Sequence, residues 1–176
     1  MTQIRRILAA FIVLCMLLSV MPSSAFALET SGKCGENVTW SYNKANQSLY
    51  ISGTGDMESY EFSSSVPWYY YRSDIVSVVI QKGVTSVGEY AFSYCRSLIA
   101  VDASASSVTK IESSAFSQCE SLITVKLPET VCEIGLWAFS GCSDMKNINF
   151  PSSLKTVGRA AFSSCSSRLK KARILV

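Results

Sequence analysis

The dipeptide Ala-Phe recurs along the second half of the chain at a nearly constant interval, and this repeat limits the possible folds more than any other feature. The copies begin at Ala91, Ala115, Ala138 and Ala161, which gives steps of 24, 23 and 23 residues. Aliphatic residues stand seven and four positions before every Ala. A cysteine follows three positions after every Phe, at Cys95, Cys119, Cys142 and Cys165. A fixed period of this length is typical of stacked repeats.

Each repeat also contains a short strand pattern. The copies are Ile75-Val78-Ile80, Leu98-Val101-Ala103, Leu122-Val125-Leu127 and Met145-Ile148-Phe150. The last two apolar positions of each copy alternate with polar ones, as in a strand with one buried face. A unit of this size cannot bury that face alone, so neighbouring copies must stack. The sequence therefore predicts a β-rich solenoid with a parallel sheet, in which Phe stacks on Phe, Cys on Cys and Ala on Ala.

Glycines indicate a bend just before three of the Ala-Phe blocks. They are Gly88, Gly135 and Gly158, whereas the second copy has Glu112 at the equivalent place. A positive φ is therefore not obligatory at this position, since glycine is the residue that adopts it freely.

The repeats resemble the BspA-like, or Treponema-type, leucine-rich-repeat family. The matching segments read VTSVGEYAFSYCRSLIAV, VTKIESSAFSQCESLITVKLP and VCEIGLWAFSGCSDMKNINFP, and the resemblance covers about residues 73–176, or about four and a half coils. It implies a right-handed leucine-rich-repeat superhelix with parallel strands on the concave side. It also implies adhesion or binding of host proteins outside the cell, with no cofactor.

Residues 28–72 are expected to cap the first coil, because the open end of a solenoid exposes its core. Val38, Trp40 and Tyr42 alternate with polar residues, and a second strand pattern follows around Leu49 and Ile51, so a β-hairpin is expected. This segment also looks like the leader found before such repeats. Pro67 to Tyr71 form an aromatic cluster. We interpret this aromatic cluster as a lid that covers the first coil. The alternative is a platform that binds a glycan or peptide.

The first 27 residues read as a secretory signal peptide cleaved after Ala27. Arg5 and Arg6 precede the apolar run Ile7 to Val20, and Ala25-Phe26-Ala27 matches a cleavage site. The alternative is a membrane anchor, but the run is shorter than the roughly 18 apolar residues that a span needs. Losing two arginines and no acid lowers the formal net charge from +3 to +1. We therefore expect a secreted or cell-surface protein that contacts a membrane only through its signal peptide and binds no nucleic acid.

The chain has no histidine, so Ser-His and Cys-His nucleophile pairs and imidazole metal sites are excluded. We expect neither catalysis nor a bound metal or cofactor. The four cysteines of the repeat are expected to form a buried ladder of thiols, although neighbours in such a ladder would lie within disulfide range. Cys34 and Cys132 lie off the ladder, and their pairing stays open.

The expected function is binding of a protein or glycan outside the cell, on the outward face of the parallel sheet. The candidate residues are Thr124, Lys126, Asn147, Asn149, Lys171 and Arg173. Solvated strand positions would look the same, and none of these residues is an aromatic anchor. The alternative function is a structural or targeting N-terminal fragment of a larger cell-wall protein or enzyme. The last repeat lacks a polar cap, so its open end is also a candidate for self-association.

Overall fold

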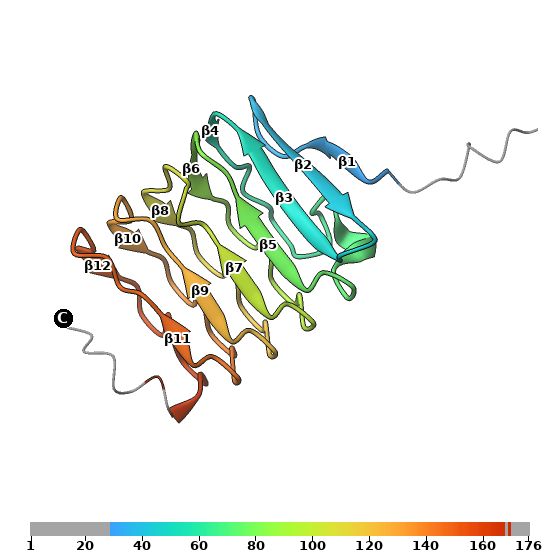
Figure 1. Cartoon of the computed structure of the whole chain (residues 1–176). Helices are drawn as coiled ribbons and strands as arrows, with labels where there is room; N and C mark the ends of the chain where they lie inside the picture. The colour runs from blue at the N-terminus through green and yellow to red at the C-terminus, as the bar shows by residue number, and fades with distance from the viewer. Residues whose placement is uncertain (1–28, 168, 170–176) are drawn as a thin grey trace, which may run out of the picture.

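The computed structural model describes residues 29–167 and 169, and it forms a solenoid with two sheets (Figure 1). The strands of the first sheet, in spatial order, are β1 (Ser31–Lys33), β2 (Val38–Asn43), β3 (Ser48–Gly53), β5 (Ser77–Ile80), β7 (Ala100–Asp102), β9 (Thr124–Lys126) and β11 (Asn147–Ile148). Those of the second sheet are β4 (Gly55–Asp56), β6 (Val84–Val87), β8 (Lys110–Ile111), β10 (Glu133–Ile134) and β12 (Thr156–Val157). The short 3-10 helix η2 (Tyr69–Tyr71) lies between β4 and β5 in the chain.

Equivalent residues of successive coils pair in register, so the predicted parallel solenoid is confirmed. In the first sheet Val78 pairs with Val101, and Val101 with Val125. These inward valines are at most 2% exposed. The second sheet continues the same register on the other side of each coil, where Ile111 pairs with Ile134. The sequence reasoning identified the aliphatic positions of this second sheet but did not assign them to strands.

The phenylalanines form one continuous stack through the interior, which we call the phenylalanine column. The ring centroids of Phe92 and Phe116 are 5.1 Å apart, those of Phe116 and Phe139 are 5.1 Å apart, and those of Phe139 and Phe162 are 5.3 Å apart. The planes of each pair are tilted by 15° or less. The predicted stacking of Phe on Phe is confirmed, and these distances set the spacing between coils.

The repeated cysteines line the core beside this column as free thiols, as expected. Cys95, Cys119 and Cys142 are at most 1% exposed, and Cys165 in the last coil is half-buried. The Cys119 thiol donates a hydrogen bond to the Phe92 carbonyl oxygen of the preceding coil at 3.1 Å. In the same way, the Cys142 thiol donates to the Phe116 carbonyl oxygen at 3.2 Å, and the Cys165 thiol donates to the Phe139 carbonyl oxygen at 3.1 Å. Burial raises the pKa of Cys95 to about 12, so this thiol is not a nucleophile at neutral pH.

The hairpin of β2 and β3 closes the first end of the solenoid, and the aromatic cluster is its lid. Trp68 is fully buried and stacks on Phe92 at 5.4 Å, which extends the phenylalanine column into the cap. Its indole N–H donates to the Ala91 carbonyl at 3.0 Å. Tyr71 stacks on Tyr42 at 4.6 Å. Strand β1, which pairs antiparallel with β2 at the edge, was not expected.

The chain bends just before each Ala-Phe block, as the glycines indicated, and the left-handed residue stands two positions after the glycine. Left-handed φ angles occur at Tyr90, Ser114, Trp137 and Ala160, between 53° and 55°. Gly135 is instead required by close packing, because a Cβ there would lie 2.7 Å from the carbonyl carbon of Glu112. The missing side chain of Gly135 therefore allows one coil to approach the next. The left-handed turn itself is made by residues other than glycine.

Candidate binding surfaces

The outward positions of β5, β7, β9 and β11 form the first-sheet face, where the sequence placed the candidate residues. Thr124 pairs in register with Asn147, so these two side chains are neighbours on adjacent strands. Thr124 is half-buried, and Asn147 is exposed. Side chains at such positions alternate with the buried ones and project away from the core. The structure therefore brings Thr124 and Asn147 together on an accessible surface.

Lys126 is exposed, but its charge is partly matched on the same face. Its ammonium group lies 3.5 Å from a carboxylate oxygen of Asp102, its register partner on the neighbouring strand. Hydrogen bonds from Ser104 and the nearby Lys126 charge hold the pKa of the Asp102 carboxyl below its usual value. The face therefore presents an ion pair at this position rather than an unpaired positive charge.

Asn149 is exposed, and its side-chain amide is engaged with the main chain of the preceding coil. Its Oδ1 accepts from the Leu127 N–H at 2.7 Å, and its Nδ2 donates to the Leu127 carbonyl at 2.9 Å. This side chain continues the ladder beyond the end of β11, a structural role that the sequence pattern did not indicate. Lys171 and Arg173 lie outside the described residues.

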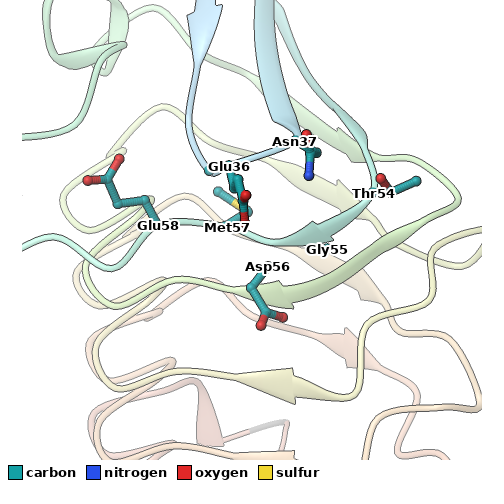
Figure 2. A pocket seen from close by; sticks show the side chains of 8 residues that line it. Glu36, Asn37, Thr54, Gly55, Asp56, Met57 and Glu58 are labelled. Carbon is teal, nitrogen blue, oxygen red and sulfur yellow. The ribbon is translucent and has the colours of Figure 1, made fainter.

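A hollow of about 600 Å³ lies where the cap meets the second sheet (Figure 2). Its lining comes from the turn before β2 and from the segment that follows β3, and includes Glu36, Asp56 and Glu58. A second hollow of about 380 Å³ shares Asp56 and Met57 with it and extends over β6 and β8. Sequence reasoning missed both hollows, because separate segments of the cap and of successive coils supply the lining.

The acidic groups around these hollows do not converge on one point. Thr85 Oγ1 donates to an oxygen of Asp56 at 2.6 Å, and Glu58 points away from Asp56 in Figure 2. In the second hollow, Lys110 forms ion pairs with Glu112 at 3.1 Å and Glu133 at 3.6 Å. No cluster of three or more potential metal ligands occurs within residues 29–167 and 169. Over the same part of the chain, no helix is long and apolar enough to cross a bilayer.

The repeat geometry agrees with a sequence comparison. Residues 54–175 match the BspA type leucine rich repeat region, in six copies. The chain belongs to this family. The match includes β4 and the aromatic lid as well as the four Ala-Phe coils. The comparison with curated protein sequences found no match.

Solved structures of bacterial leucine-rich-repeat proteins share the fold of this BspA-type chain. A leucine-rich-repeat protein from Eubacterium ventriosum is 29% identical, with a TM-score of 0.70 over 77% of this chain and 35% of that chain. The T. pallidum leucine-rich-repeat protein is 18% identical, with a TM-score of 0.55 over 75% of this chain and 67% of that chain. This chain therefore spans about a third of the length of the Eubacterium protein.

Proposed function

We propose that this BspA-type protein is an exported binding module that holds a protein or glycan partner on the first-sheet face. The observation that carries the proposal is the pairing of Thr124 with Asn147 on adjacent strands, which fixes accessible polar groups on a rigid grid. The family supports a role in interaction, and the signal peptide expected over residues 1–27, which lies outside the described residues, supports export. We propose no catalytic role, cofactor or nucleic-acid partner.

The contact is expected to be weak for one molecule. The outward positions of β7, β9 and β11 carry no aromatic residue, and aromatic residues dominate most interface energies. The ion pair of Lys126 with Asp102 is largely exposed, so it adds little affinity for a partner. Useful binding would therefore depend on several copies acting together at one surface.

Interferometry against host matrix proteins and mucin glycans tests this proposal. The test variant combines Thr124→Ala, Lys126→Glu and Asn147→Ala. The control combines Lys155→Glu and Thr156→Ala, two exposed residues at the second sheet. We expect the test variant to lose at least tenfold in affinity for a captured ligand while the control binds as the unchanged chain does. Equal binding by both variants would reject the first-sheet face.

The alternative role, a structural or targeting segment of a larger wall protein, predicts no specific ligand in the same panel.

Self-association through the last coil is a separate proposal. There Phe162 is only half-buried and packs edge-on against Phe150 at 5.5 Å. Sedimentation velocity would then show concentration-dependent dimers that a Phe162→Ser variant loses, and a monomer at all concentrations would contradict this proposal.

A further inference from the structure

A third side of the solenoid, which we call the turn face, is as regular as the two sheets. It consists of residues 90–94, 114–118, 137–141 and 160–164. Main-chain N–H groups of one coil donate to carbonyls of the next, as from Phe92 to Ala115 and from Phe116 to Ala138, both at 2.8 Å. Side chains on this face therefore also stand in rows, with the spacing of the phenylalanine column.

One row of the turn face holds the left-handed residues Tyr90, Ser114, Trp137 and Ala160. All four share nearly the same φ, between 53° and 55°. The backbone therefore accepts Ser and Ala at this place, and the fold does not require an aromatic residue. A bulky residue with positive φ is uncommon. Half-buried Tyr90 also packs against the core, whereas the exposed indole of Trp137 needs an explanation other than the backbone angle.

Trp137 differs from the other two tryptophans of the chain because its side chain faces solvent. It is 47% exposed, whereas Trp40 is 2% and Trp68 is 0% exposed. Its neighbours in the row are Ser114 and Ala160, which are too small to cover an indole ring. An exposed tryptophan flanked by small residues is a typical contact residue of a binding surface.

The turn face also carries polar groups, and exposed Arg159 lies beside Trp137, whose main-chain N–H donates to the Arg159 carbonyl at 3.2 Å. The hydroxyl oxygens of Ser140 and Ser163 lie 2.7 Å apart. The Gln118 amide lies over Gly141, since a Cβ on Gly141 would be 2.6 Å from Gln118 Nε2. The charges at the edge, Arg96 and Glu120, form an ion pair at 3.0 Å. The turn face therefore combines aromatic rings with neutral hydroxyl and amide groups.

We propose that the turn face binds a β-1,4-linked saccharide chain, with exposed Trp137 and half-buried Tyr90 stacked against sugar rings. The apolar C–H face of a pyranose ring fits an aromatic ring, and its hydroxyl edge fits hydroxyl and amide groups. A chain of this linkage turns each sugar over relative to the last, so that every second sugar presents the same face. Its partner therefore needs rings one disaccharide apart.

The spacing of the two rings meets that requirement. Tyr90 and Trp137 occupy the same row two coils apart, with Ser114 between them. One coil step is 5.1 Å in the phenylalanine column, so two steps place the Tyr90 and Trp137 positions of the row about 10 Å apart, close to the length of one disaccharide. The site lies on a different side of the coils from the first-sheet face and does not depend on it.

Intrinsic fluorescence and calorimetry test this proposal with cellohexaose, chitohexaose and xylohexaose as probes. Trp137 is the exposed tryptophan, so a bound sugar should change its emission and protect it from acrylamide quenching. We expect at least one probe to bind, and Trp137→Ser to weaken its binding at least tenfold. Tyr90→Ser should weaken it several-fold. The control Tyr70→Ser removes a ring that is 72% exposed on the cap and should bind normally.

The folding of the test variant can be checked independently. Ser114 already occupies the equivalent position, so Trp137→Ser should keep the thermal unfolding temperature. Lys126→Glu, on the first-sheet face, should bind the sugar unchanged, which separates this site from the function proposed above. The proposal is overturned if no probe binds at millimolar concentration, or if a folded Trp137→Ser variant binds as the unchanged chain does.

Discussion

Removing one ring from the middle of the phenylalanine column should destabilise the protein far more than removing the ring at its end. Phe116 is 1% exposed and stacks on a ring on either side at 5.1 Å. Truncation of a buried Phe to Ala costs about 3–5 kcal/mol, and the loss of two stacked neighbours places Phe116→Ala near the upper part of that range, at about 4 kcal/mol. For a chain of this size, the unfolding temperature should fall by about 8–16 °C.

The comparison variant is Phe162→Ala in the last coil. Phe162 is half-buried, stacks on Phe139 alone and meets Phe150 edge-on, so its truncation should cost about half as much. In a repeat protein each coil is stabilised mainly by its neighbours, which is why position along the stack matters. Urea denaturation followed by circular dichroism measures both free energies of unfolding. An equal or larger loss for Phe162→Ala would refute the reasoning.

Three further predictions concern the interior. The Tyr60 hydroxyl is buried and has no hydrogen-bond partner, so Tyr60→Phe should leave the free energy of unfolding unchanged or raise it by up to about 1 kcal/mol; a clear loss in urea denaturation would contradict this. Burial raises the pKa of Cys95 to about 12, so the unfolded chain loses this proton first as the pH rises and stability must fall above pH 9. Between pH 9 and pH 10 the loss from this thiol should be about 1 kcal/mol, and Cys95→Ala should remove it from the measured pH profile. A Cβ at Gly135 would meet the main chain of Glu112 at 2.7 Å, so Gly135→Ala should lower the free energy of unfolding by about 2 kcal/mol in urea denaturation. The control Glu112→Ala, at the equivalent place in the preceding coil, should lower it by less than about 1 kcal/mol.

The interior of the solenoid was predictable because its constraints repeat. Each position that must face the core recurs four times, so Phe and Cys appear at fixed intervals and can be recognised as core residues. The left-handed residues also recur, but Tyr90, Ser114, Trp137 and Ala160 share no chemical property that marks the backbone angle. The sequence therefore showed the core and the bend before each Ala-Phe block, but not which residue takes the left-handed angle.

The candidate surfaces were less predictable because they depend on pairs of residues in different coils. Asn149 looked like an outward ligand-binding group, yet its amide is held by the Leu127 main chain of the preceding coil. The acidic hollow is lined by two segments that the hairpin of β2 and β3 brings together. Neither arrangement repeats along the chain, so no periodic signal could have indicated it.

The repeat also provides its own comparison between structural and functional demands. Two residues after each left-handed position stands a Phe in all four coils, because the core there has one shape. At the left-handed position itself, the same backbone carries two aromatic rings, a hydroxyl and a methyl group. Since Ser114 and Ala160 satisfy the fold, the indole of Trp137 adds no packing that the coil requires. The exposure of this indole in water is therefore the observation on which the proposed saccharide site depends.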